Sequence, residues 1–173
     1  MLRGAGITDA AIDYRAPAVA RATAAEYERL CPRDLSACVA PGVAEALAAL
    51  AREPERYRLA LVTGNLEPVA RRKLAAAGIG HHFAAGQGGF GSDAERRGEL
   101  PAIARARAGG WPRERTVVIG DTPRDIACAR VDGVRVIAVA TEAYSAEELA
   151  DADAVVDGVR AALPVLEDFA TRA

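Results

Sequence analysis

The sequence lacks the features that mark a protein for nucleic acid or for a membrane. Its 173 residues carry 22 basic and 24 acidic side chains, so the formal net charge is only −2. That balance predicts no basic surface for nucleic acid or for anionic lipid. No apolar run approaches the roughly 20 residues that a membrane-spanning helix needs, and residues 1–6 lack the apolar stretch of a signal peptide. We therefore expect neither nucleic acid nor a membrane as a partner.

Cysteine and lysine are scarce as well. Cys31, Cys38 and Cys128 are an odd number of cysteines, and their spacing is not that of a disulfide scaffold. Free thiols in a reducing compartment are the simplest interpretation, so we expect a cytoplasmic protein. Lys73 is the only lysine, whereas hydrophobic residues make up 51% of the chain, as in an ordinary globular protein.

From residue 40 onward, strand-like and helix-like patterns alternate. Strands are expected over residues 57–63, 82–85, 116–120, 134–139 and 154–156. Helices are expected over residues 41–50, 69–77, 93–109, 123–131, 145–149 and 159–170. This alternation predicts an α/β fold with a doubly wound, Rossmann-like parallel sheet. Residues 1–39 contain helical stretches and no convincing strand, so we expect a helical appendage there and an α/β core over residues 40–173.

A hydroxyl, a glycine and an amide follow the first expected strand, as Thr63-Gly64-Asn65. Open α/β sheets bind their ligands just beyond the carboxyl ends of strands. The Thr63 hydroxyl, the backbone N–H groups of the turn and the N-terminus of the next helix are donors suited to a phosphate oxygen. The alternative is that Thr63 only caps that helix. This turn alone does not decide between the two interpretations.

The clearest strand ends in Gly120-Asp121-Thr122-Pro123-Arg124-Asp125. We expect Asp121 at the end of the strand and Asp125 one turn into the following helix. Carboxylate oxygens in this arrangement suit Mg²⁺, which is the cofactor we expect. The alternative is that both carboxylates only cap the helix and complement its dipole. A Gly-Asp pair directly after a fully buried strand favours the metal site.

Together these turns resemble the second and fourth motifs of the haloacid dehalogenase superfamily, and within it the phosphoglycolate phosphatase-like members. The resemblance is specific over residues 120–125 and moderate over residues 62–65. The order of strands and helices agrees from about residue 40 to the end, and residues 1–39 resemble the trailing part of the family's helical cap. The family's third motif, a Lys or Arg that neutralises the phosphoryl group, falls at Arg97, with Arg96 as the neighbouring alternative. Either arginine is also compatible with a solvated helix position.

The resemblance implies a Mg²⁺-dependent hydrolase that acts on a small phosphorylated metabolite. In such an enzyme Thr63 binds the phosphoryl group together with Gly64 and Asn65, and Arg97 balances its charge. Asp121 ligates the metal, and Asp125, one turn later, ligates or orients it. Thr63, Arg97 and Asp121 are therefore the residues expected to take part in catalysis.

The sequence departs from the family at the first motif. That motif is a mid-sheet strand ending in Asp-x-Asp, whose first aspartate attacks phosphorus and whose second is the general acid–base. The only Asp-x-Asp here, Asp151-Ala152-Asp153, follows a helix and precedes the last strand, so it is in the wrong place. We expect the sheet to lack its central strand, between the strands ending at Thr63 and Gly120. We interpret the chain as N-terminally truncated and expect it to be inactive or nearly so.

Two alternatives remain open from the sequence. One is a non-enzymatic remnant that binds phosphate or a partner and self-associates through the incomplete sheet. The other is a 2-haloacid dehalogenase, which we rank lower because such enzymes need no metal while residues 120–125 retain a metal-type motif. The glycine-rich stretch 86–91 matches G-x-G-x-x-G by letter, but no strong strand precedes it, so dinucleotide binding is not expected.

Overall fold

The computed structural model describes residue 6 and residues 8–171, and its strands form two parallel sheets. In the two-strand sheet, β1 (Val62–Thr63) pairs with β2 (Gly89–Phe90). In the three-strand sheet, the order is β3 (Val117–Gly120), β4 (Arg135–Val139) and β5 (Ala154–Val156). Within the described residues, all these pairings are parallel, which confirms the α/β, Rossmann-like class.

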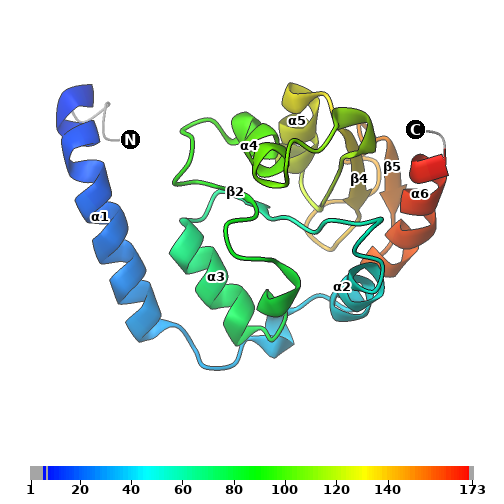
Figure 1. Ribbon diagram of the computed structural model, residues 1–173, viewed down its shortest axis with the longest axis horizontal. Coiled ribbons are helices and arrows are strands. Elements are labelled where there is room, and N and C mark those ends of the chain that lie inside the picture. Colours follow the sequence, from blue (N-terminus) through cyan, green and yellow to red (C-terminus); the bar gives the residue numbers. More distant parts are fainter. Residues whose placement is uncertain (1–5, 7, 172–173) are drawn as a thin grey trace.

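Helices surround the two sheets (Figure 1). Their bounds are α1 Asp9–Leu30, α2 Val43–Ala51, α3 Glu67–Ala76, α4 Leu100–Arg107, α5 Pro123–Asp132 and α6 Val159–Thr171. Figure 1 shows α1 standing to one side of the remaining elements, with α3 as its neighbour. None of the α1 residues is buried. Among the described residues, no helix combines the length and the apolar character needed to cross a membrane.

The main hydrophobic core lies on the three-strand sheet. Every β4 residue from Val136 to Val139 is buried, although successive side chains point to opposite faces, so both faces of this strand are covered. Helix α5 contacts β3 and β4, and helix α6 contacts β4 and β5. The buried cluster comprises Ile126, Ala129, Val134, Val136, Ala138 and Leu149.

The two-strand sheet depends on close backbone approach. A Cβ built on Gly89 would collide with the Leu100 carbonyl oxygen, and one built on Gly91 would collide with the Gly64 carbonyl oxygen. Gly88 has φ +126°, a conformation that side chains disfavour. The glycine-rich stretch therefore lets β2 pass between α4 and the turn after β1.

No strand pairing joins β1 to β3 among the described residues, so the sheet is interrupted where we expected the central strand to be missing. A cavity of about 370 Å³ lies in this position, lined by Val62 of β1 and by residues 117–119 of β3. The two sheets are nevertheless connected through α4, which contacts β1, β2 and α5. A buried ion pair strengthens this connection, since Arg105 of α4 binds both carboxylate oxygens of Asp132 at 2.8 and 2.7 Å.

Several expected elements differ from the structure. The strand expected over residues 82–85 is wrong, because a 3₁₀ turn occupies Gly80–His82 and the strand forms later, at Gly89–Phe90. The strand expected over residues 57–63 pairs only at Val62–Thr63, since the preceding residues line the cavity without a partner strand. Residues 145–149 form turns rather than a helix. The helix expected from residue 93 begins at Leu100, after a 3₁₀ turn at Arg97–Glu99.

Candidate phosphate site at the strand ends

The turn after β1 is closed by its own polar side chains. The Thr63 hydroxyl accepts hydrogen bonds from the Asn65 backbone N–H at 3.2 Å and from the Asn65 amide Nδ2 at 3.1 Å. The Lys73 ammonium, two turns along α3, donates to Asn65 Oδ1 at 3.3 Å. Leu66 is the N-cap of α3 and no side chain caps it, so the alternative in which Thr63 caps the helix is wrong. The bonds among Thr63, Asn65 and Lys73 instead fix the turn itself, and they hold the Thr63 hydroxyl at the end of β1.

The turn after β3 contains a capping box. Thr122 is the N-cap of α5, and Asp125 Oδ2 accepts from the Thr122 backbone N–H at 3.2 Å and from its hydroxyl at 2.7 Å. Gly120 is required for this approach, because a Cβ there would lie 2.5 Å from the Asp125 carboxyl carbon. Asp125 therefore caps α5, which was the alternative to a role as a metal ligand. Asp121 is different, since it is exposed and has no hydrogen-bond or ion-pair partner within residues 8–171.

Arg97 lies between the two turns. Its Nη2 binds Asp125 Oδ1 at 2.5 Å, and a Cβ built on Gly64 would lie 3.6 Å from its Nη1. The Arg97 side chain is 38% exposed, whereas Asp125 is 14% exposed. One guanidinium therefore contacts the carboxylate that caps α5 and borders the turn after β1.

Two neighbours hold the Arg97 backbone in place. The Cys128 thiol donates to the Arg97 carbonyl oxygen at 3.0 Å. Gly98 lets this segment lie directly against α5, because a Cβ there would be 2.9 Å from the Val131 side chain. Burial raises the pKa of the Cys128 thiol, which keeps it protonated and able to donate. Arg96, by contrast, is 85% exposed and pairs with Glu99, so Arg97 is the arginine that the structure places at the strand ends.

Asp153 of the misplaced Asp-x-Asp has a structural role at the opposite edge of the sheet. It precedes β5, and its Oδ2 accepts from the Val136 backbone N–H at 2.7 Å and from Arg130 at 2.8 Å. This position is at the amino ends of β4 and β5, away from the ends that carry Gly120 and Asp121. It cannot serve the candidate site.

The donor set for a metal ion is partial. Both Asp125 oxygens already accept hydrogen bonds, so of these two carboxylates Asp121 is the one whose oxygens have no partner among residues 8–171. Among the described residues, no three His, Cys, Asp or Glu side chains come together as a metal cluster. Mg²⁺ is commonly held by one or two carboxylates together with water and substrate phosphate. Asp121 fits that pattern as one ligand, and Asp125 fits as a neighbouring group whose orientation Arg97 and Thr122 fix.

Sequence reasoning missed Lys73 and Cys128 as parts of this site. Lys73 lies in α3, eight residues after Asn65. Helical side chains tilt toward the N-terminus of their helix, so the Lys73 side chain extends toward the turn that contains Asn65. That spacing, and its being the only lysine, were signals available in the sequence. The Cys128 contact joins segments 31 residues apart, and no local pattern predicts it.

The comparison with known families agrees with this arrangement. The family model of haloacid dehalogenase-like hydrolases matches residues 2–130. The matched span covers most of the 173 residues and includes both strand-end turns and Arg97. The chain belongs to the haloacid dehalogenase-like hydrolase family. No curated protein matches it.

Proposed function

We propose that the site is the phosphate-binding half of a Mg²⁺-dependent phosphate monoester hydrolase of the phosphoglycolate phosphatase-like type. The observation that carries this proposal is the position of the Arg97 guanidinium, between the turn after β1 and Asp125. A cation beside a glycine-containing strand-end turn suits a phosphoryl group, because hydrogen bonds between charged groups are the stronger ones. A small phosphorylated metabolite is the substrate class.

Each residue of the site has a distinct role in this proposal. The Thr63 hydroxyl and the Gly64 backbone N–H donate to phosphoryl oxygens. Asn65 holds the Thr63 oxygen in place through its backbone N–H and amide, and Lys73 orients that amide through Oδ1. Arg97 balances the phosphoryl charge. Asp121 provides a metal ligand, and a bound Mg²⁺ would supply charge stabilisation for the phosphoryl oxygens.

Asp125 acts indirectly, because it holds Arg97 and Thr122 in place. It also lies in the first turn of α5, where a carboxylate complements the helix dipole. Asp125 is thus a positioning residue, and its loss would displace Arg97 rather than remove a ligand.

We infer that no aspartate of the described residues takes the place of the family's nucleophile in this site. The only Asp-x-Asp is at the opposite sheet edge, and the position between β1 and β3 holds no strand among the described residues. We therefore propose that this chain binds phosphate without turning over a phosphate ester. The non-enzymatic alternative, a chain that binds phosphate or a partner, gains support from the same interrupted sheet.

Calorimetry and an activity assay on the purified chain test both parts. Inorganic phosphate should bind saturably with Mg²⁺ present, and Thr63→Val and Asp121→Asn should each weaken binding about tenfold or more. Arg96→Ala is the matched control, since that side chain is exposed and pairs elsewhere. Absence of phosphate binding with and without Mg²⁺ would overturn the site. Hydrolysis of an aryl phosphate that requires Mg²⁺ and disappears in Asp121→Asn would overturn the proposed inactivity alone.

A further inference from the structure

One aromatic side chain of α1 contacts the lysine that orients the turn after β1. Tyr27 lies in the last turn of α1, and the Lys73 ammonium is 5.4 Å from the centre of its ring. An ammonium within about 6 Å of an aromatic ring centre is attracted by the electrons of the ring. Both side chains are half-buried, so water screens this attraction only in part. Lys73 is therefore held between two partners, the Tyr27 ring and Asn65 Oδ1.

This contact lies where α1 is attached to α3. Next to Tyr27, the Glu28 carboxylate pairs with Arg72 at 3.1 Å, so neighbouring residues of one helix contact neighbouring residues of the other. Shortly after α1, the Leu35 backbone N–H donates to the Ala76 carbonyl oxygen at the end of α3, at 2.9 Å. Figure 1 shows α1 beside α3 and to one side of the other elements. Because α1 has no buried residue, these contacts are what hold its aromatic ring against α3.

Lys73 decides which way the Asn65 amide faces. An asparagine amide has an acceptor oxygen and a donor nitrogen, whereas an ammonium group has donors only. Asn65 Oδ1 faces Lys73 at 3.3 Å, which leaves Nδ2 to donate to the Thr63 hydroxyl oxygen at 3.1 Å. The reversed amide would place the Nδ2 hydrogens against a positive charge. The ammonium therefore favours the orientation in which Asn65 donates to Thr63.

The same bonds leave the Thr63 hydroxyl as a donor. A hydroxyl oxygen has two lone pairs that accept hydrogen bonds and one O–H that donates. Thr63 accepts from the Asn65 backbone N–H at 3.2 Å and from Nδ2, so both of its lone pairs are engaged. What remains is the O–H, which suits an unprotonated oxygen of a bound phosphate. A donor fixed in advance in this way does not have to reorient when the ligand binds.

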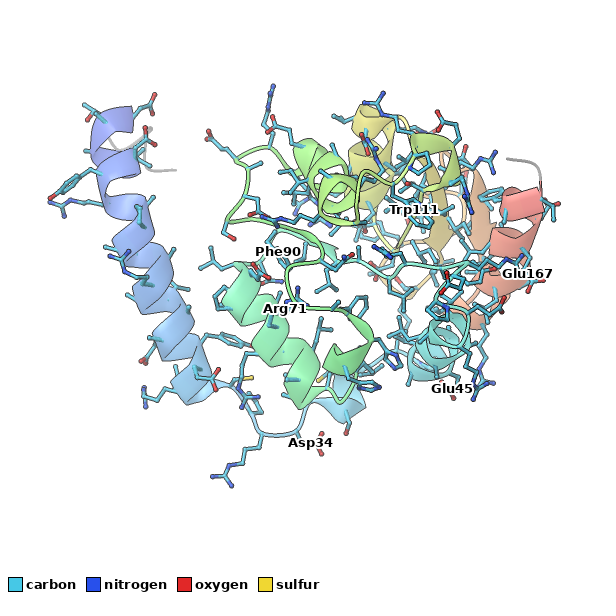
Figure 2. All side chains as sticks on the ribbon, viewed as in Figure 1. Asp34, Glu45, Arg71, Phe90, Trp111 and Glu167 are labelled. Carbon is cyan, nitrogen blue, oxygen red and sulfur yellow. The ribbon has the colours of Figure 1, made fainter. Side chains whose placement is uncertain are left out.

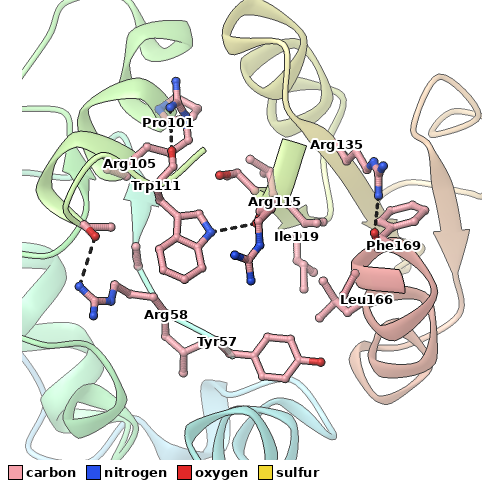
Figure 3. Close-up of a pocket in the computed structure, with 18 of the residues that line it drawn as sticks. Tyr57, Arg58, Pro101, Arg105, Trp111, Arg115, Ile119, Arg135, Leu166 and Phe169 are labelled. Atoms are coloured by element: carbon pink, nitrogen blue, oxygen red, sulfur yellow. Dashed lines mark hydrogen bonds between the residues drawn. The ribbon is translucent and has the colours of Figure 1, made fainter. Parts of the chain in front are cut away.

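We propose that Tyr27 is a positioning residue for the phosphate site, acting through Lys73 on the Asn65 amide. This inference rests on the proposed phosphate-binding function. Tyr27 lies outside the strand-end turn, so it acts on the ligand only through these two side chains. The route is separate from the cavity between β1 and β3, whose lining Figure 3 shows around Trp111 and includes none of the residues that make this contact.

Substitutions at Tyr27 test the route by calorimetric titration of inorganic phosphate with Mg²⁺ present. Tyr27→Leu removes the aromatic face and should weaken phosphate binding about threefold to fivefold. Tyr27→Phe keeps that face and should bind phosphate within about 1.5-fold of the unchanged protein. Glu28→Gln is the matched control, because it breaks the neighbouring contact with Arg72 and leaves Lys73 untouched. Its phosphate affinity should also stay within about 1.5-fold.

A double-mutant cycle separates this route from a general loss of packing between the helices. Lys73→Met removes the ammonium and should weaken phosphate binding about tenfold. In that background Tyr27→Leu should cause no further loss, because the contact through which it acts is already gone. Additive losses would overturn the inference. It would equally be overturned if Tyr27→Phe or Glu28→Gln weakened binding as much as Tyr27→Leu does.

The Asn65 side-chain amide gives a second readout, which needs no phosphate. In the ligand-free chain, the nuclear magnetic resonance signals of the Asn65 Nδ2 protons should shift in Tyr27→Leu and in Lys73→Met, but not in Tyr27→Phe. If Tyr27→Leu leaves both these signals and the phosphate affinity unchanged, this inference is overturned while the proposed function stands. Absence of phosphate binding by the unchanged protein would overturn both.

Discussion

The two sheets of this fold are held together by different interactions. In the β3–β4–β5 sheet, apolar side chains are buried on both faces of β4, and Val136 and Ile137 are 0% exposed. In the β1–β2 sheet, arginines replace much of that packing. Arg71 and Arg107 both lie near the buried Phe90 ring, at 5.4 and 6.0 Å, and both donate to nearby backbone carbonyl oxygens (Figure 2 labels Arg71 and Phe90).

The difference explains how the site tolerates an interrupted sheet. The three-strand sheet has its own core, in which Ile126 and Ala129 of α5 are buried, and this packing fixes α5 against the sheet. The two-strand sheet positions Thr63 through glycine contacts and charged side chains, which do not require a large apolar core. Arg97 joins the two parts at the strand ends, and Arg105 with Asp132 joins them between α4 and α5.

The largest expected effect tests the core of the three-strand sheet. Leu149 is 0% exposed and packs in the main cluster, so Leu149→Ala should lower the free energy of unfolding by about 2–5 kcal/mol. Urea denaturation followed by circular dichroism measures this. Val19→Ala, on a side chain that is 61% exposed, should change it by less than about 0.5 kcal/mol. Equal losses in both variants would contradict a core centred on this sheet.

A glycine substitution tests the two-strand sheet. In Gly91→Ala the new methyl group collides with the Gly64 carbonyl oxygen, so the turn that carries Thr63 must shift. We expect a stability loss of about 1–3 kcal/mol together with weaker phosphate binding. Gly158→Ala is the control, because no atom lies within 4 Å of a Cβ there and its φ is not positive. Undiminished phosphate affinity in Gly91→Ala would separate this turn from the site.

The link between the two sheets is tested by a neighbouring pair of arginines. Arg97→Ala removes the guanidinium between Gly64 and Asp125 and should weaken phosphate binding by about tenfold, or roughly 1.4 kcal/mol. Arg96→Ala removes a side chain that is 85% exposed and should leave phosphate affinity within twofold. Calorimetric titration compares them. A larger effect of Arg96→Ala would mean that the site uses the other arginine.

The smallest effect is pH-dependent and belongs to the two-strand sheet. Arg107 holds the pKa of Asp93 below its usual value, and the Phe90 backbone N–H also donates to this carboxylate. A carboxyl group whose pKa is lower in the folded state than in the unfolded state stabilises the fold at pH values above its unfolded-state pKa, which is near 3.8 for Asp93. That stabilisation is lost as the pH falls through the folded-state pKa. We expect at most about 1 kcal/mol, because Arg107 is partly exposed.

Asp93→Asn provides the matched comparison for that pH effect. It should reduce the loss of melting temperature below about pH 4 by the share that belongs to Asp93, because Asp153 also has a lowered pKa and keeps its own share. Near neutral pH the melting temperature of Asp93→Asn should be lower than that of the unchanged protein. Melting curves from pH 3 to 7 compare the two proteins. An unchanged acid limb in Asp93→Asn would show that other carboxylates set it.

Local sequence patterns were enough to predict the strands whose residues form continuous apolar runs. The apolar strands β3, β4 and β5 lie where they were expected, and β3 ends at Gly120 with Asp121 directly after it. β2 escaped prediction because Gly89 and Phe90 carry no alternation, and the strand exists through tertiary packing of Phe90, which is 0% exposed. The sequence could not predict that Asp121 and Asp125 differ in their contacts. The long-range contact with Arg97, together with the bond from Thr122, engages both Asp125 oxygens, and only the structure shows it.

Whether the two strand-end turns form one site is tested most directly by nuclear magnetic resonance. Inorganic phosphate is titrated into the labelled chain with Mg²⁺, and the amide signals of Gly64, Asn65, Asp121 and Thr122 are followed. We expect signals from both turns to shift together with a single dissociation constant, and Arg97→Ala to raise that constant for both turns. Shifts confined to one turn, or two unrelated dissociation constants, would contradict a shared phosphate site.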